Sequence, residues 1–156
     1  MSEVAVKNKF RSDISGFARA IAKTPGAKVG HEADSELCPL EHAYVKGAYR
    51  RKIFMPKGLI TVSKIHKVEH FYFIMKGKCR VRTEDGIVIL EAPYLGITPA
   101  GTQRGIEVLE DCEWVTLHLT DSTDLEEIEE QIIAKDFNDP ALPENKNLQI
   151  EEERNV

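Results

Sequence analysis

Three histidines in this chain lie in short stretches whose alternating pattern is typical of β-strands. Lys64 and His66 are two residues apart, so an extended strand projects both side chains to one face. On the next stretch His70 shares a face with Tyr72 for the same reason. A later stretch carries a polar and aromatic face made of Trp114, Thr116, His118 and Thr120. Imidazoles and cations brought together in this way suit metal, anion or acid–base chemistry.

A divalent metal is one candidate ligand for this group. Neutral imidazole nitrogens are common zinc ligands, and catalytic zinc sites often use three protein ligands with one open position. If a metal binds, the expected ligands are His66, His70 and His118. The positive charges of Lys64 and Arg104 would repel a cation, so the sequence favours no metal cofactor.

A small anion is the ligand that the same charges favour. Arg104 can donate two parallel hydrogen bonds to a carboxylate or a phosphate, and Lys64 adds a point charge. Aromatic side chains can stack on a base or a sugar ring. The expected ligand-binding residues are Lys64, His66, His70, Tyr72, Arg104 and Trp114.

Acid–base catalysis is a third use of the histidines. His66, His70 or His118 could exchange protons with a phosphodiester while the cations stabilise developing charge. His118-Leu119-Thr120 has the H-x-T spacing of two-histidine phosphoesterases, but that chemistry needs two such motifs and the chain has one. A purely structural role stays open too, with hydrogen-bonded histidines and a Lys64 ammonium that extends to solvent.

Composition excludes several classes of protein. With 156 residues, 42% hydrophobic and 30% charged, the chain has the size and balance of one soluble globular domain. No run approaches the roughly 20 apolar residues that cross a bilayer, and the first residues lack the features of a leader peptide. We therefore expect a cytoplasmic protein without membrane contact. Cys38, Cys79 and Cys112 are too scattered for a disulfide framework or a zinc knuckle and are expected to be small buried residues.

Charge is unevenly distributed along the chain. Residues 121–156 hold 12 acidic and 3 basic residues, which leaves the first 120 residues mildly basic. No dense basic stripe with interleaved aromatic residues occurs, so long nucleic acid is not an expected partner. The nearest basic group is expected to be a solvated face and consists of Lys46, Arg50, Arg51, Lys52 and Lys57.

Short stretches with a period of two follow one another through the middle of the chain, and turn residues separate them. This spacing is typical of a β-sandwich or barrel. Asp85-Gly86 between two apolar runs predicts a hairpin with a type I′ turn. The predicted strands span residues 49–55, 59–66, 70–75, 78–83, 87–90, 104–109 and 113–120.

Two amphipathic helices flank the predicted strands. The first has apolar residues at helical spacing from Phe10 to Ala22, with Ser12 as its expected cap and Pro25-Gly26 as its stop. The second begins after Ser122-Thr123-Asp124, has an apolar face from Leu125 to Ile133 and ends at residues 137–140. The expected division is a helix and loop (1–43, with residues 30–41 as connection), a barrel (44–120), a helix (121–140) and a flexible acidic tail (141–156).

Two segments resemble the motifs of the cupin superfamily. Residues 58–77 resemble the first motif, G-x(5)-H-x-H-x(3,4)-E-x(6)-G, and residues 99–104 resemble the second, P-x-G-x-x-H. The resemblance implies a cupin-type double-stranded β-helix, an all-β jelly-roll barrel with flanking helices. It places at the family's four ligand positions Lys64, His66, His70 and Arg104. Only His66 keeps the expected residue type, and the resemblance implies that all four converge on the barrel mouth, where His118 could join them.

From about residue 44 to 137 the chain also resembles small cupin-like proteins encoded by tailed bacteriophages, in phrases such as Phe54-Met-Pro-Lys-Gly58 and Glu91-Ala-Pro-Tyr94. That resemblance implies a phage protein in an infected bacterium that sequesters or cleaves a small anion, such as an acidic sugar or a nucleotide-derived host immune signal. A metal-dependent cupin enzyme and a non-enzymatic virion or assembly protein are the alternatives. Barrel edges and apolar helix stripes favour a homodimer or a higher homo-oligomer.

Overall fold

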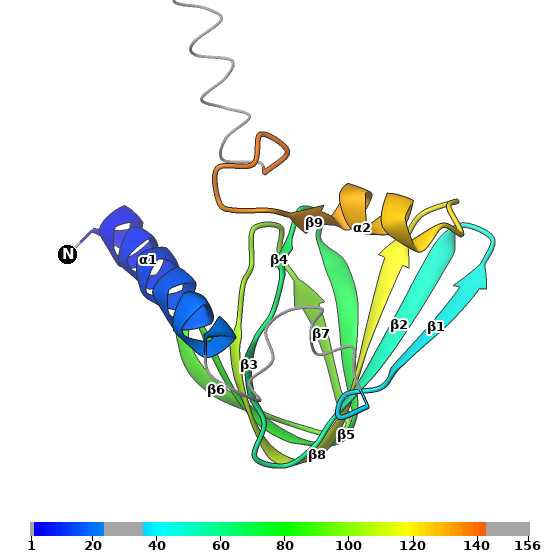
Figure 1. Ribbon diagram of the computed structural model, residues 1–156, viewed down its shortest axis with the longest axis horizontal. Coiled ribbons are helices and arrows are strands. Elements are labelled where there is room, and N and C mark those ends of the chain that lie inside the picture. Colours follow the sequence, from blue (N-terminus) through cyan, green and yellow to red (C-terminus); the bar gives the residue numbers. More distant parts are fainter. Residues whose placement is uncertain (1, 24–35, 143–156) are drawn as a thin grey trace, which may run out of the picture.

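The computed structural model describes residues 2–23 and 36–142, which form two helices and nine strands (Figure 1). The helices are α1 (Glu3–Ala22) and α2 (Leu125–Ile132). The strands are β1 (Leu40–Val45), β2 (Ala48–Met55), β3 (Ile60–Val62), β4 (Ile65–His66), β5 (His70–Thr83), β6 (Gly86–Glu91), β7 (Tyr94–Thr98), β8 (Gly105–Leu119) and β9 (Ile133–Ala134). The expected fold class, an all-β barrel of the cupin type with flanking helices, is confirmed.

A seven-stranded antiparallel sheet curves to form the barrel. Its strand order is β1-β2-β8-β5-β6, with β3 also paired to β8 and β7 to β5. The main core fills the concave side and includes Met55, Tyr72, Ile74, Val81, Leu90, Val108 and Trp114. Burial of this apolar surface is the dominant favourable contribution to folding. All three cysteines are buried and free, as the sequence predicts.

Two predicted turns lie inside long strands instead. Lys76-Gly77 lies within β5 and Glu110-Asp111 within β8, at the point where the pairing register of the two strands shifts. Gly77 has a φ of 88°, and a Cβ atom there would lie 2.1 Å from the Asp111 carbonyl oxygen. The glycine therefore permits a close approach at a β-bulge, which bends the sheet without reversing the chain. The division of each long strand into two was wrong for this reason.

One predicted strand, residues 59–66, is divided between two sheets. β3 pairs with β8, whereas β4 pairs with β9. The chain leaves the main sheet at Ser63, whose N–H donates to the Arg104 carbonyl oxygen at 2.8 Å. Strand β1 begins within the predicted loop 30–41, and β7 lies where no strand was expected.

The hairpin at Asp85-Gly86 is confirmed, because β5 and β6 pair outward from Thr83 and Gly86. Its turn type differs from the prediction. A type I′ turn needs a positive φ at both central residues, here Glu84 and Asp85. Among the described residues only glycines have a positive φ, and Gly86 has a φ of 117°. The positive φ therefore lies one position beyond the loop.

Helix α1 starts ten residues before the expected position. Ser2 is the N-cap, and its Oγ accepts a hydrogen bond from the Ala5 N–H at 3.2 Å. The predicted cap, Ser12, lies inside the helix. The helix packs against β3, and the buried side chains of this apolar cluster are Phe10, Ile14 and Ile21 of α1 and Val62 of β3. The predicted stop at Pro25-Gly26 lies outside the described residues.

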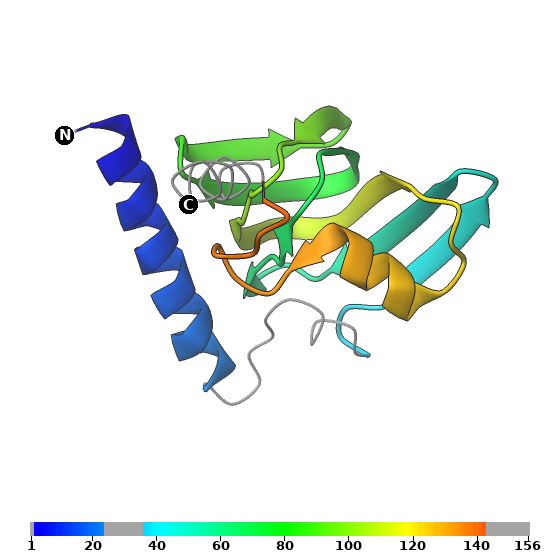
Figure 2. The same ribbon diagram turned by 90° about the horizontal axis from the view of Figure 1, so that it is seen from above.

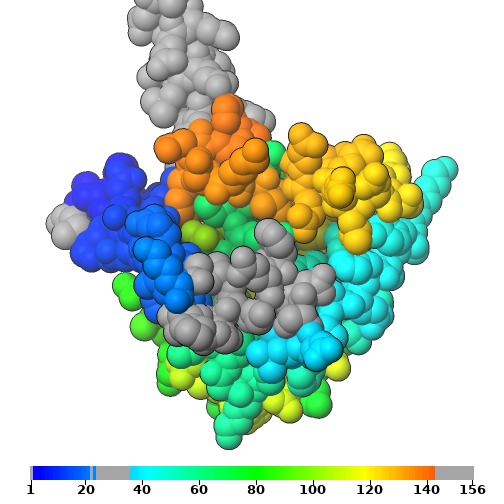
Figure 3. All heavy atoms as spheres, viewed as in Figure 1, coloured from blue at the N-terminus to red at the C-terminus, as the bar shows by residue number. Residues whose placement is uncertain are grey.

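Helix α2 and strand β9 lie across one end of the barrel (Figures 2 and 3). Asp124 caps α2 by accepting hydrogen bonds from the N–H groups of Glu126 and Glu127. The helix ends at Ile132, because the next residue, Ile133, enters β9 and pairs with His66 of β4. The prediction that the helix continues beyond Ile132 was wrong for this reason.

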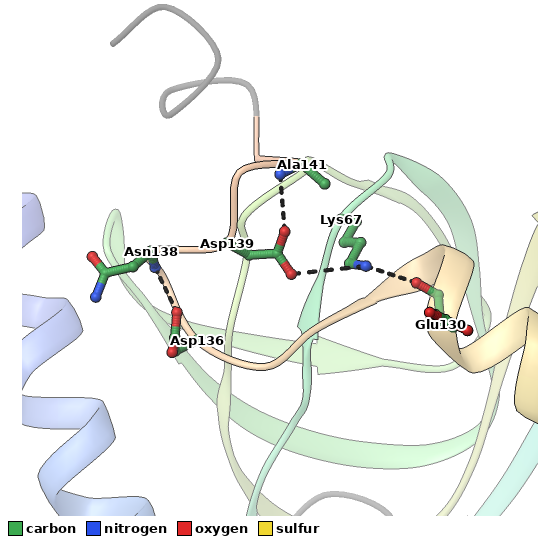
Figure 4. Close-up of polar contacts among 6 residues, drawn as sticks. All are labelled: Lys67, Glu130, Asp136, Asn138, Asp139 and Ala141. Atoms are coloured by element: carbon green, nitrogen blue, oxygen red, sulfur yellow. Dashed lines mark hydrogen bonds and ion pairs between the residues drawn. The ribbon is translucent and has the colours of Figure 1, made fainter. Parts of the chain in front are cut away.

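The chain after β9 is fastened to the barrel. Lys67 Nζ donates to the Glu130 carbonyl oxygen at 2.7 Å and lies 3.7 Å from the Asp139 carboxylate (Figure 4). Leu142 is fully buried against Ile65 and Ala134 of the same chain. We call residues 125–142 the closing segment. The remainder of the predicted acidic tail, 143–156, lies outside the described residues.

Candidate functional site

The pairing of β5 with β8 brings two of the predicted histidines together. Thr116 of β8 lies opposite Tyr72 of β5. Because alternate side chains share a face, His118 and His70 meet one row further along the inner face. Their ring centroids lie 4.4 Å apart. The period-two pattern in the sequence is therefore sufficient to place both rings inside the barrel.

His66 of β4 completes a cluster of three buried imidazoles. Its ring centroid lies 4.3 Å from that of His70 and 5.8 Å from that of His118. One nitrogen of each ring lies within 4.8 Å of the other two. None of the three histidines is more than 9% exposed. These are the three residues that the sequence names as ligands if a metal binds.

All three imidazoles are neutral at pH 7. Burial is the main cause that lowers the pKa of His66 well below its usual value, and repulsion from the other two rings adds to it. Burial also lowers the pKa of His70, and it lowers the pKa of His118 to about 3. The neutral ring is the form that binds a metal ion or accepts a hydrogen bond.

Hydrogen bonds orient two of the rings and leave the third without a partner. His70 Nδ1 donates to the Val68 carbonyl oxygen at 3.1 Å, so its Nε2 carries the lone pair. His118 Nε2 lies 3.0 Å from the Thr116 hydroxyl. His66 Nδ1 is buried and has no hydrogen-bond partner among the described residues. A buried polar atom left unpaired costs about 1–3 kcal/mol, which a bound ligand would recover.

These nitrogens fit a divalent metal ion. A tetrahedral ion with metal–nitrogen distances near 2.1 Å sets its ligand nitrogens roughly 3.4 Å apart. One nitrogen of each ring lies within 4.8 Å of the other two, so small side-chain rotations would bring the three nitrogens onto one ion. Neutral rings, burial and the unpaired nitrogen of His66 all suit such an ion.

Arg104 is a buried cation beside this cluster. Its side chain is 7% exposed, and its guanidinium carbon lies 4.8 Å from the centroid of the Tyr72 ring and 5.8 Å from that of Trp114. Among the described residues no carboxylate forms an ion pair with it. Burial lowers the pKa of Arg104, but a guanidinium remains charged at neutral pH. A buried charge without a counter-charge is costly, so the position favours an anionic ligand.

Lys64 does not add a second unpaired cation to the site. Its ammonium lies 2.7 Å from the Glu129 carboxylate of α2, in the closing segment. The pair joins the barrel mouth to the helix that lies over it. The sequence predicts that the Lys64 ammonium repels a metal ion. In the folded protein the Glu129 carboxylate largely offsets this repulsion.

Tyr72 and Trp114 stack on each other and not on an open surface. Their ring centroids lie 5.1 Å apart with an interplanar angle of 15°, and both side chains are buried. Burial raises the pKa of the Tyr72 phenol, while Arg104 acts in the opposite direction. In this arrangement both rings also contact the Arg104 guanidinium through cation–π interactions.

The space beside Arg104 and the histidines is small. The cavity has a volume of about 80 Å³. A water molecule occupies roughly 30 Å³ in the liquid, so this space has room for about two or three water-sized groups. Its polar wall includes Arg51, His66, His70, Arg104 and Thr116. A second cavity, of about 150 Å³, lies under α2 and is lined by His66 and His118.

Arg51 and Tyr49 are site residues that the sequence analysis missed. Arg51 lies in the cavity wall, which corrects the expected solvated basic face at this position. Tyr49 is buried, and its ring stacks on that of His118 with 5.9 Å between centroids. The alternation of Tyr49, Arg51 and Ile53 along β2 is a signal that would have placed all three on one face.

The H-x-T segment offers little support for phosphoesterase chemistry. His118 points into the barrel, but the Thr120 hydroxyl donates to Gln131 Oε1 at 2.9 Å and accepts from the Ser122 N–H at 3.1 Å. Both hydrogen bonds of the threonine hydroxyl stabilise the connection to α2. A base with a pKa of about 3 is also a weak proton acceptor at neutral pH.

Solved structures with a similar fold include several cupin-domain proteins. The Cnp3 cupin domain of Schizosaccharomyces pombe is 17% identical, covers 62% of this chain and 72% of its own, and has a TM-score of 0.48. A cupin superfamily protein from Desulfitobacterium hafniense DCB-2 is 13% identical, covers 56% and 81%, and has a TM-score of 0.47. No protein-family model and no curated protein sequence matches the chain. Neither described helix is both long enough and apolar enough to cross a membrane.

Proposed function

We propose that this chain binds a small anion inside the barrel, with Arg104 as its counter-charge and with a divalent metal on His66, His70 and His118. The observation that carries the proposal is the cluster of three buried, neutral imidazoles beside a buried arginine with no acidic partner among the described residues. A metal ion held there would supply a Lewis acid that polarises a ligand oxygen. The chain's own residues supply the charge, the dry walls and the fixed ring orientations.

Cavity size narrows the class of ligand. Sites for drug-sized molecules usually have volumes of about 300–1,000 Å³. The 80 Å³ beside Arg104 accepts a carboxylate or an inorganic oxyanion, or the charged group of a larger molecule. The nucleotide signal or acidic sugar expected from the phage resemblance would place only its charged group in this space. Sequestration is favoured over phosphodiester cleavage, because neutral histidines with strongly lowered pKa values are poor acids and bases at pH 7.

Metal content and ligand-dependent stability test this proposal. The full chain is stripped with a chelator, reloaded with Zn²⁺, Ni²⁺ or Co²⁺ and measured by mass spectrometry of the metals. Thermal unfolding is then followed with phosphate, small carboxylates, nucleotides and cyclic dinucleotides, because a true ligand raises the melting temperature by mass action.

We expect one metal per chain in the wild type and in His42→Ala, and a loss of at least tenfold in affinity in His66→Ala. His42 is a fair control because it lies outside the cluster, with Nδ1 2.6 Å from the Tyr49 hydroxyl. Absence of both metal and any anion-dependent shift would overturn the proposal and favour the assembly role.

A further inference from the structure

A third cavity, of about 380 Å³, lies between α1 and the outer face of the sheet. Arg82 of β5 lines it, and because the neighbouring Val81 is buried in the main core, alternation directs Arg82 outward. Neither Arg104 nor any of the three clustered histidines is among its lining residues. We call this space the helix groove; it is separate from the site inside the barrel.

Two contacts fix the helix that forms one wall of the groove. Phe10 and Ile14 of α1 pack with Val62 of β3. Nearer the start of the helix, Lys7 Nζ lies 3.7 Å from the carboxylate of Glu84, in the loop between β5 and β6. In the ribbon views α1 stands beside β6 (Figures 1 and 2). Because the helix is attached both to β3 and to the β5–β6 loop, the groove has defined walls.

A glycine leaves room in the wall opposite the helix. Gly105 of β8 lies between Val62 of β3 and Arg82 of β5 in the sheet. Its φ is not positive, so the backbone does not require a glycine there. A Cβ atom at this position would meet nothing closer than the Arg82 Cβ, at 3.9 Å. The missing side chain therefore leaves space that a ligand can fill.

Apolar side chains from three elements meet in the groove and are exposed to solvent. Phe17 of α1 is 45% exposed, Ile60 of β3 is 51% exposed and Ile87 of β6 is 66% exposed. Removing such side chains from water is favourable in proportion to the apolar area covered. Pockets for small molecules usually have volumes of about 300–1,000 Å³ and mainly apolar walls. The groove thus has the size and lining of a small-molecule site.

The charged residues of the groove leave one cation without an acidic partner. The Asp13 carboxylate lies 2.6 Å from Lys9 Nζ, and Glu107 forms an ion pair with Arg80. Among the described residues Arg82 has no ion-pair partner. One unpaired guanidinium suits a ligand with a single negative charge, because Asp13 and Glu107 would repel a dianion such as a phosphate group.

We propose that the helix groove binds a small molecule with an apolar body and one carboxylate, of the class of the medium-chain fatty acids. The guanidinium of Arg82 donates two parallel hydrogen bonds to the carboxylate. The apolar body covers Phe17, Ile60 and Ile87 and occupies the space beside Gly105. A protein partner would instead need about 800 Å² of surface on this chain, which exceeds what a groove of this size offers.

Isothermal titration calorimetry of the full chain with octanoate tests the site, and octanol is the neutral comparison with the same apolar body. A chelator removes any metal beforehand, so that carboxylate binding to a metal is not measured. Arg82→Met removes the charge, and Phe17→Ala removes apolar wall while keeping a good helix former. The matched control is Arg19→Met, an exposed arginine of α1 that does not line the groove. Circular dichroism verifies the fold of each variant.

The wild type, Arg19→Met and Arg104→Met are expected to bind one octanoate per chain with the same affinity. The wild type should bind octanol about fivefold more weakly, which is the contribution of an exposed ion pair. Arg82→Met is expected to bind octanoate no more tightly than octanol. Phe17→Ala should weaken the binding of both molecules by about fivefold, because less apolar surface is covered.

A wild type that binds no octanoate would overturn the proposal, whatever else covers the groove. An octanoate affinity that neither Arg82→Met nor Phe17→Ala changes would overturn it equally. A loss of octanoate binding in Arg104→Met alone would place the carboxylate inside the barrel and not in the groove. None of these outcomes depends on a metal bound to the histidines.

Discussion

The ammonium of Lys64 and the carboxylate of Glu129 lie 2.7 Å apart, although 65 residues separate them in the chain. The pair changes the electrostatics of the barrel mouth, because it leaves Arg104 as the buried cation without an acidic partner in the described part of the chain. It also connects the edge of the site to the closing segment. The sequence predicts two cations at the barrel mouth, Lys64 and Arg104. In the folded protein Glu129 offsets the charge of Lys64, so the mouth repels a metal ion less strongly than the sequence predicts.

Glu129→Gln is expected to weaken divalent-metal binding about tenfold, because the Lys64 ammonium then acts on the site without this carboxylate. The free energy of unfolding should change by less than about 1 kcal/mol, since Glu129 is half exposed. Calorimetric titration of stripped protein with Zn²⁺ measures the affinity. Glu130→Gln is the control, because only the backbone carbonyl of Glu130 bonds Lys67. Equal affinities in the two variants would contradict the electrostatic role.

The metal-free protein is expected to lose stability as the pH falls below neutrality. An unfolded histidine has a pKa near 6.5, whereas the folded pKa of His118 is about 3. Between these values the unfolded state binds more protons, so the free energy of unfolding rises with pH through this window. Within this window His118 alone lowers the free energy of unfolding by about 1.4 kcal/mol for each unit by which the pH falls.

Denaturant unfolding of chelator-treated protein at several pH values between 7 and 4 measures this slope. His118→Gln removes one titrating group and is expected to flatten the slope, while His42→Gln should leave it steep. A slope that His118→Gln does not alter would refute the assignment.

Arg104→Met is expected to abolish anion-dependent stabilisation without lowering the melting temperature of the free protein. A methionine of similar length keeps the contacts with Tyr72 and Trp114 but carries no buried charge. Thermal unfolding with and without phosphate or acetate measures both effects. If the variant retains the wild-type anion shift, the anion binds elsewhere.

Gly96→Ala is expected to lower the free energy of unfolding by about 1–3 kcal/mol, because overpacking displaces a well-packed ring. A Cβ atom at this position would lie 2.4 Å from the Tyr72 ring. Gly105→Ala is the matched strand control, since its Cβ would meet nothing closer than 3.9 Å. Urea unfolding compares the two variants, and similar stabilities would show that the Tyr72 ring has room to move.

Much of the site follows from local pattern. The period of two places His70 with Tyr72 and His118 with Thr116, and the antiparallel pairing of their strands then joins the two faces. The resemblance to cupin motifs adds His66 and Arg104 to the same cavity. Alternation is visible in the sequence itself, whereas the convergence of the strands on one mouth was an expectation from the resemblance.

The errors come from contacts between distant segments. Gly77 has the appearance of a turn residue, but its conformation serves a close approach to Asp111 across the sheet. Lys64 has the appearance of a free cation because Glu129 is remote in sequence. Neither contact leaves a local signal, since turn propensity and charge are read without knowledge of the partner.

The alternation along β5 and β8 places an apolar residue of the outer face of the sheet next to each of these two buried histidines. His70 precedes Phe71, and Leu117 precedes His118. Inserting or deleting a single residue between the strand ends would exchange the two faces and bring phenylalanine and leucine into the barrel. Length variation in descendants of this sequence should therefore be confined to connections such as the Glu84-Asp85 loop, while the spacing within β5 and β8 stays constant.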